Sequence, residues 1–196
     1  MIDEREHALV VVGMRSNKGP QRAMAVLAAL PERLRARTRL WLIGPASAGL
    51  RLWRFRQALA LGIAPLVRQL GALDDVAPLL ARADLCLHLS DDEGQPLALL
   101  EAMAEGTPVI ASDVSGCREL LCASDEDGEG DVGIVVAKDD TAGAATQVAR
   151  LLEATEERAR LGAAAQRRAA QQHDVASTTA AFRDAVIAFA RGEHLS

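Results

Sequence analysis

The 196-residue sequence predicts an α/β fold, a doubly wound parallel sheet of six strands covered by helices. Short apolar runs that end in glycine or in polar residues alternate with segments whose apolar residues keep helical spacing. This alternation is typical of parallel strands joined by helices. With 49% hydrophobic and 25% charged residues, the chain is long enough for one sizeable core. We therefore expect a single domain over residues 1–196, with strand order 3-2-1-4-5-6.

The first half of the chain supplies three of the expected strands. A continuous apolar run, Ala8–Val12, ends at Gly13 and fits a strand buried on both faces. The helix expected over 50–61 stops at Gly62, a residue type that suits a helix C-terminus. The expected strands are 8–12, 39–43 and 67–71, and the expected helices are 21–30 and 50–61.

The second half supplies three more strands and a helical C-terminal region. Asp74 is a suitable N-cap for a short helix over 74–81. Pro96 suits the first position of the next helix, where its missing N–H costs nothing. The other expected strands are 85–89, 107–111 and 133–136, and the chain is expected to be helical over about 141–191, with its last two helices at 156–172 and 177–191.

The most informative stretch is the strand, turn and helix in the middle of the chain. Alternating leucines make the strand over 85–89, and a polar turn over 90–94 separates it from the helix. The first amides of that helix, on Leu97 and Ala98, point back toward the carboxyl end of the strand. Because a helix dipole favours anions there, the sequence predicts a phosphate site at this turn.

Charged side chains accompany two of the expected turns. Arg15 and Lys18 follow the first strand, at the edge where open α/β sheets bind ligands. Glu93 lies in the central turn, and Glu101 follows eight positions later on the helix. The spacing alone leaves a simpler interpretation open, in which Glu101 and Glu105 mark a solvent-facing side of the helix and the other three are surface charges.

A resemblance to a known family gives these carboxylates a role. The segment Glu93–Ala104 resembles the two-glutamate motif of retaining GT-B glycosyltransferases of the large family 4 type. The resemblance implies a Rossmann-like domain in which Glu101 accepts hydrogen bonds from the ribose hydroxyls of a nucleotide sugar and Glu93 holds hydroxyls of the donor sugar. It also implies that backbone groups lie near the phosphate and the sugar at Gln95, Pro96 and Leu97.

Two further segments are similar to parts of the same family. The loop that begins at Gly13 resembles the Arg-x-x-Lys-Gly variant of the phosphate-binding loop, in which Arg15 and Lys18 would neutralise the donor diphosphate. Many members place the arginine directly after the glycine, where this chain has Met14. The strand that contains Leu70 resembles the one whose backbone lies against the nucleotide base, and the resemblance leaves open which base is bound.

Composition excludes several other classes of function. A net charge of -5 and a pI near 5.4 argue against a protein that binds nucleic-acid phosphates, and aromatic residues make up only 3% of the chain. The sequence contains no apolar stretch long enough to span a bilayer and no signal peptide, so we expect a cytoplasmic protein. Its three cysteines form no CxxC pair, and its four histidines lack metal-ligand spacing, so neither a metal nor another cofactor is expected. His88 is either a strand residue or a neighbour of the donor sugar.

The resemblance implies transfer of a sugar from a nucleoside diphosphate donor, with retention of configuration and without a metal. It extends from Val10 to about Gln172 and concerns only the carboxyl-terminal, nucleotide-sugar-binding half of a GT-B enzyme. The acceptor half is expected in another domain or a partner chain. The alternatives are a subunit of a split transferase and a non-catalytic module that binds a nucleotide or a sugar phosphate.

Overall fold

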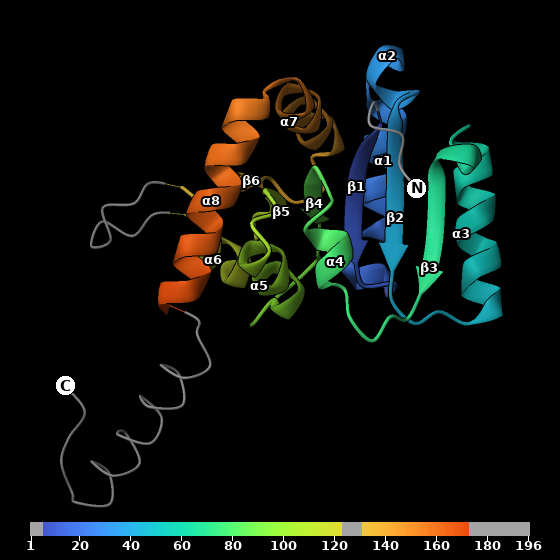
Figure 1. Cartoon of the computed structure of the whole chain (residues 1–196). Coiled ribbons are helices and arrows are strands. Elements are labelled where there is room, and N and C mark those ends of the chain that lie inside the picture. Colours follow the sequence, from blue (N-terminus) through green and yellow to red (C-terminus); the bar gives the residue numbers. More distant parts are fainter. Residues whose placement is uncertain (1–5, 123–130, 173–196) are drawn as a thin grey trace, which may run out of the picture.

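The computed structural model describes residues 6–122 and 131–172 (Figure 1). Six parallel strands form one sheet in the order β3-β2-β1-β4-β5-β6, which confirms the predicted topology. The last expected helix, 177–191, lies outside the described residues. The strands are β1 (His7–Val12), β2 (Thr38–Ile43), β3 (Val67–Gly71), β4 (Leu85–His88), β5 (Val109–Ser112) and β6 (Ile134–Val136).

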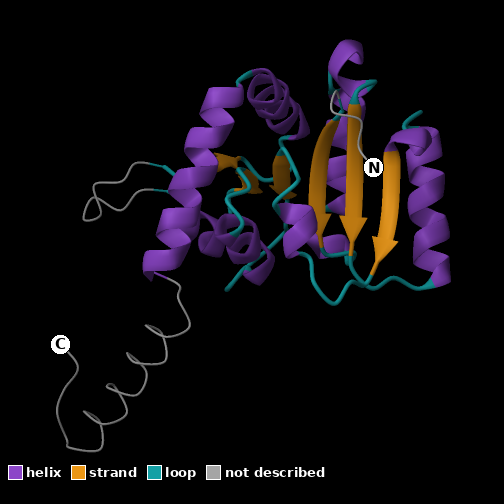
Figure 2. Ribbon diagram, viewed as in Figure 1, coloured by secondary structure: helices purple, strands orange, loops and turns teal. Residues whose placement is uncertain are grey.

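Helices cover both faces of this sheet (Figure 2). On one face lie α1, α3 and α7, and on the other lie α4, α5, α6 and α8. The helices are α1 (Pro20–Ala29), α2 (Glu32–Arg35), α3 (Ala48–Ala60), α4 (Ala77–Leu80), α5 (Leu97–Ala104), α6 (Ser115–Leu121), α7 (Thr141–Glu153) and α8 (Thr155–Gln172), with single turns of 3-10 helix at Ser16–Lys18 (η1) and Ala64–Leu66 (η2).

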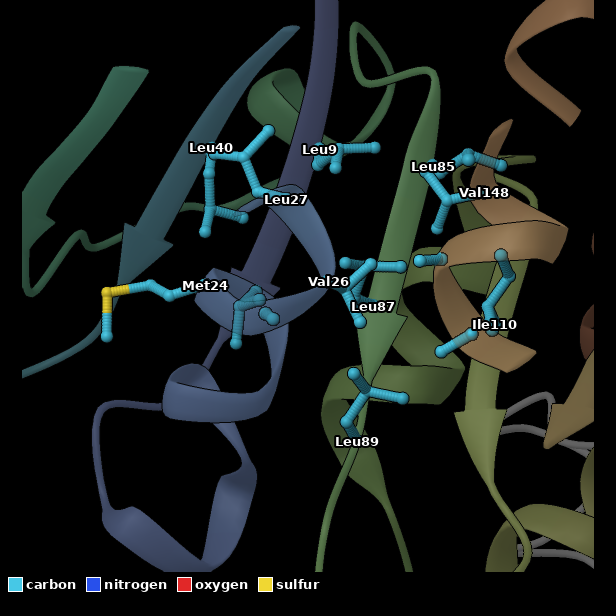
Figure 3. Packing of buried hydrophobic residues seen from close by; sticks show 14 of the residues in the cluster. Leu9, Met24, Val26, Leu27, Leu40, Leu85, Leu87, Leu89, Ile110 and Val148 are labelled. Carbon is cyan, nitrogen blue, oxygen red and sulfur yellow. The ribbon is translucent and has the colours of Figure 1, made fainter. Parts of the chain in front are cut away.

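The apolar strands are buried on both faces, as their sequences predict. Leu9 and Val11 belong to the core between the sheet and α1, whereas Val10 packs into the core on the opposite face. Figure 3 shows Met24 and Leu27 of α1 among the strand residues of the first core. Burial of a leucine or methionine side chain stabilises a fold by about 1.5–3 kcal/mol, so these two cores hold the sheet in its register.

Several predicted element ends are wrong by one to three residues, as three examples show. The short helix α4 begins at Ala77 and not at Asp74, and it is Asp75 whose carboxylate accepts a hydrogen bond from the Ala77 amide, at 2.9 Å. The strand predicted from residue 107 begins at Val109, because the Thr107 amide donates to the Ala102 carbonyl in the last turn of α5, at 2.9 Å, and Pro108 has no amide proton to donate. Helix α5 begins one residue after Pro96, which occupies the N-cap position.

The topology brings the loops after β1, β4 and β5 to one edge of the sheet. These three strands are adjacent in the sheet and parallel, so their carboxyl ends meet. Ligands of open α/β sheets bind at this edge, beside the point where the strand order reverses. Among the described residues, no helix is long and apolar enough to cross a membrane.

Candidate functional site

The loops after β1 and β4 are packed directly against each other. The Asp91 amide donates to the Asn17 carbonyl, at 2.8 Å. Gly19 adopts a positive φ of 74°, and a Cβ at this position would lie 1.9 Å from the Leu89 carbonyl oxygen. Only glycine fits there, so the sequence fixes how closely the two loops approach.

The Lys18 side chain extends from the first loop into the second. It leaves the single turn η1 and passes over Gly13, where an added Cβ would lie 2.9 Å from the Lys18 Cγ. The Lys18 Nζ donates to the Glu93 Oε1 at 2.6 Å. The structure therefore brings together two of the predicted site residues, which are 75 positions apart in the sequence.

Glu93 is the centre of a buried polar cluster. Only 6% of Glu93 and 3% of His88 are exposed. Besides Lys18, the Ser90 hydroxyl lies 2.7 Å and the His88 Nε2 lies 2.9 Å from Glu93 Oε1. A carboxylate only accepts hydrogen bonds, so we assign the His88 proton to Nε2, from which it also faces the Ser90 Oγ at 3.2 Å.

Electrostatics keep this cluster in one protonation state at neutral pH. Burial alone would raise the pKa of Glu93, but hydrogen bonds from Lys18 and Ser90, with the charges of His88 and Lys18, lower that pKa below its ordinary value. Burial lowers the pKa of His88, an effect that the neighbouring Glu93 opposes without cancelling it. Glu93 is therefore an anion, Lys18 its counter-ion and His88 a neutral donor.

Helix α6 supports the turn that carries Glu93. The Gly116 amide donates to the Glu93 carbonyl oxygen, at 3.1 Å. A Cβ at Gly116 would lie 2.7 Å from the carbonyl oxygens of Glu93 and Gly94. This contact leaves no room for any side chain at position 116. It therefore determines how closely the turn that carries Glu93 packs on α6.

Arg22 of α1 is a site-supporting residue that the sequence analysis missed. Its guanidinium donates to the Leu89 carbonyl, through Nε at 2.8 Å, and to the Asp91 carboxylate, at 2.8 Å. It also reaches Asp139 in the loop after β6, at 3.1 Å. No local pattern could have identified it, because all its partners come from distant loops.

The other predicted site residues have looser surroundings. Arg15 precedes η1 and is exposed, and its side chain has no hydrogen bond or ion pair to the described residues. Glu101 lies on the exposed side of α5, and burial raises its pKa. The expectation of a free amide on Leu97 is wrong, since this amide donates to the Gln95 carbonyl at 3.0 Å.

Leu70 lies apart from the cluster. It belongs to β3, two strands away from β1, and lines a cavity of about 570 Å³ that also involves Trp41 and Arg68. Its expected contact with a nucleotide base stays a prediction. Over the part of the chain that the structure describes, no three His, Cys, Asp or Glu side chains gather in a group that could hold a metal ion.

Comparison with known proteins places this geometry in a family. The family description "Glycosyl transferases group 1" matches residues 2–168. The chain belongs to this family. Membership in glycosyl transferases group 1 confirms the predicted resemblance to GT-B glycosyltransferases, while the narrower family 4 type stays a prediction.

Two curated relatives show how much of a group 1 glycosyltransferase this chain represents. It is 36% identical to the lipopolysaccharide glucosyltransferase WaaG of Escherichia coli K12 over 123 residues, which are 61% of this chain and 32% of that protein. It is 44% identical to the N-acetyl-alpha-D-glucosaminyl L-malate synthase of Bacillus anthracis over 84 residues, which are 43% of this chain and 20% of that protein. The chain thus spans a third or less of these relatives.

Solved structures agree with the group 1 assignment. The crystal structure of WaaG superposes with a TM-score of 0.75 at 29% identity, covering 88% of this chain and 45% of that one. A structure of HepE from Anabaena in complex with UDP and glucose gives a TM-score of 0.84 at 24% identity, covering 94% of this chain and 49% of that one. The HepE likeness shows a shared fold.

Proposed function

We propose that this chain is the donor-binding half of a retaining, family 4-type glycosyltransferase that transfers a hexosyl group from a nucleoside diphosphate sugar. The observation that carries the proposal is the Lys18 ammonium, held at the ligand-binding edge of the sheet by Gly13 and Glu93. A fixed cation at this edge suits a diphosphate, whose negative charge grows as the sugar departs.

The diphosphate subsite is assigned to the loop after β1. Lys18 already points into the site, and Arg15 is exposed and has no partner among the described side chains, so it can turn toward a phosphate. Gly13, with a φ of 122°, has no side chain, so the Lys18 stem can pack over it and carry the ammonium across the loop. These groups would stabilise the leaving diphosphate directly, so the proposal requires no metal.

The sugar and ribose subsites are assigned to the two glutamates. The hydrogen bonds that Glu93 receives within the described chain all converge on Oε1, which leaves Oε2 for hydroxyls of the donor sugar. Glu101, which lies on the exposed side of α5 and makes no ion pair with the described side chains, would accept hydrogen bonds from the ribose hydroxyls. Backbone groups of Gln95, Pro96 and Leu97 would lie near the phosphate and sugar, with the base against the backbone of Leu70.

The choice of ligand for a first test follows from the structural neighbours. HepE has been solved with UDP-glucose and WaaG is named a glucosyltransferase, so UDP is a suitable probe. The chain contains two lysines, and Lys138, exposed near Asp91 in the loop after β6, is the matched control for Lys18.

Calorimetry on the two lysine variants tests the proposal. A hydrogen bond to a charged partner contributes about 1.5–3 kcal/mol, so Lys18→Ala should weaken UDP binding by roughly tenfold to a hundredfold. The same variant should leave uridine binding nearly unchanged, because the partner of Lys18 is the diphosphate. Lys138→Ala should bind both ligands as the unmodified chain does. Equal losses for UDP and uridine in Lys18→Ala would show that Lys18 is an ordinary surface cation.

A further inference from the structure

Helix α3 exposes its apolar side chains and buries a charged one. Leu52, Phe55 and Leu59 are 51%, 47% and 55% exposed. They recur three and four residues apart, so they form one stripe along the outer side of the helix. The fully buried side chains of α3 are Arg54 and Ala58, which face the core. An apolar stripe of this kind in contact with water indicates a docking surface.

Exposed arginines flank this stripe. Arg51 and Arg56 flank it, are both exposed, and have no acidic partner among the described side chains. The segment 33–73 contains eight arginines and not one acidic residue, although the whole chain has a net charge of -5. The segment that carries the stripe is thus basic in a chain that is acidic overall, although its Arg33 and Arg39 form ion pairs with acidic residues outside it.

These features match a helix that lies in the interface of an anionic bilayer. Such helices insert Leu, Phe and Trp between the lipid headgroups while arginines beside them contact the phosphates. Trp53 is 46% exposed on the same helix, where the Arg54 guanidinium stacks on its ring at 4.6 Å, and Trp is a residue type enriched at membrane interfaces. We propose that the outer face of α3 docks on anionic lipid headgroups.

The size and place of the stripe favour a lipid surface over a protein partner. A stable protein interface needs about 20–30 residues on each side, whereas this stripe is one helix wide. In Figure 1, α3 stands alongside β3, at the end of the molecule opposite α8. Docking through its outer face leaves the carboxyl edge of the sheet, with Lys18 and Glu93, open. The proposal does not depend on what binds there.

Vesicle sedimentation of the full chain tests the proposal without any donor ligand. The chain should bind phosphatidylcholine vesicles that contain phosphatidylglycerol, bind pure phosphatidylcholine vesicles much more weakly, and dissociate as salt is raised. The double variant Phe55→Ser, Leu59→Ser should lose roughly tenfold or more in affinity, because it removes two exposed apolar side chains that the bilayer would bury. The control variant Leu73→Ser alters an exposed leucine outside α3 and should bind normally.

Charge and insertion can be tested separately. Arg56→Gln should weaken binding to the anionic vesicles, whereas Arg160→Gln, an exposed arginine on α8, should not. The Trp fluorescence should shift to shorter wavelength on binding, and Trp53→Phe should abolish the shift while Trp41 remains. The proposal is overturned if the chain ignores anionic vesicles at low salt or if the Phe55→Ser, Leu59→Ser variant binds them normally. It is also overturned if the chain dimerises without lipid and that variant is monomeric, since the stripe would then be a protein interface.

Discussion

Glu93 carries a negative charge in a place that water hardly reaches. Three donors from three positions satisfy one of its oxygens, and the Lys18 ammonium balances its charge. In the free protein, part of the positive charge available for a ligand is therefore already neutralised. A diphosphate that binds Lys18 competes with Glu93, so the strength of this ion pair sets an upper limit on donor affinity.

His88 makes the stability of the protein sensitive to mild acid. Its pKa in the folded protein lies below the ordinary value of 6.5, because burial penalises the imidazolium. At a pH between the folded pKa and 6.5, His88 is protonated in the unfolded chain and neutral in the folded chain. The contribution of neutral His88 is therefore complete above pH 6.5 and is lost as the pH falls toward its folded pKa.

We therefore expect His88→Gln to flatten the dependence of stability on pH. Urea unfolding between pH 7 and pH 5 should show a smaller loss of unfolding free energy in this variant, and His7→Gln, outside the cluster, should keep the loss. Glu93 contributes separately at lower pH. Its folded pKa lies below the ordinary value of 4.5, so its stabilisation is complete above pH 4.5 and is lost as the pH falls through the folded pKa. An unchanged slope in His88→Gln would contradict the assignment of neutral His88.

Arg54 is a second buried charge, and it is poorly satisfied. Its side chain is fully buried, and its Nη1 contacts the side-chain oxygens of Gln21 and Gln57 at 3.1 and 3.2 Å. Among the described residues its Nε and Nη2 have no hydrogen-bond partner, and burial lowers its pKa. Desolvation of such a group is costly, and an apolar side chain of similar volume is often at least as stable in its place.

Arg54→Met is accordingly expected to stabilise the fold by about 1 kcal/mol or more, since it fills the same volume without a charge. Arg54→Ala should destabilise it, because the truncation leaves a cavity. Chemical denaturation would give both values, with exposed Arg56→Met as the neutral control on the same helix. A less stable Arg54→Met protein would mean that this guanidinium supports the fold.

At the scale of elements, the site depends on how closely α6 approaches the turn after β4. Helix propensity favours alanine over glycine by about 1 kcal/mol, so Gly116→Ala would be stabilising if α6 stood alone. We expect the opposite, because the new Cβ would meet two carbonyl oxygens of the Glu93 turn at 2.7 Å. Gly116→Ala should lower the melting temperature and weaken UDP binding.

Gly49 in α3 offers the matched control for this substitution. A Cβ there would meet only the Ser47 hydroxyl, at 4.0 Å. Gly49→Ala should therefore raise the melting temperature slightly and leave UDP binding intact. If both alanine variants behave alike, the close contact at Gly116 does not hold the site in place.

Sequence patterns predicted the elements well where one property dominates. Continuous apolar runs such as Ala8–Val12 identified the buried strands, since only a doubly covered sheet buries both faces, whereas β3, with its exposed Arg68, was placed by its resemblance to the family. Element ends were less predictable, because competing contacts decide them, such as the Thr107 amide that donates to the Ala102 carbonyl of α5. The sequence pattern also predicted that α3 exists, but it did not predict which side of this helix faces the core. Nothing in the local sequence shows that Arg54 faces inward and Phe55 outward.

Some residues of the candidate site could be predicted from the sequence, and others could not. Lys18 and Glu93 lie in turns after expected strands, but it was the resemblance to the family that singled them out, and the structure brings the two turns together. The roles of Ser90 and Arg22 could not be predicted, because hydrogen bonds across distant loops leave no periodic signal. Arg15, Glu101 and Leu70 stay predictions until a ligand is bound.

At the scale of the molecule, the isolated chain is expected to bind UDP but to transfer no sugar. It covers 32% of WaaG and 45–49% of the solved WaaG and HepE chains, and we expect the acceptor to bind the remaining part. An assay of UDP release from UDP-glucose, with and without a candidate acceptor domain, would decide. Robust transfer by the pure chain would contradict the expectation, and activity restored by a separate partner chain would favour a split enzyme.

The central position of β1 has a consequence for how the protein forms during synthesis. β1 can pair with β2 early, but its other side waits for β4, and the Ala8 amide that donates to the Asp84 carboxylate must find a partner 76 residues later. Until then the nascent first half exposes an unpaired, apolar strand edge at what becomes the middle of the sheet. Closing so long a loop is slow. Folding therefore waits for β4, and the ribosome-bound chain is most prone to aggregation just before that strand emerges.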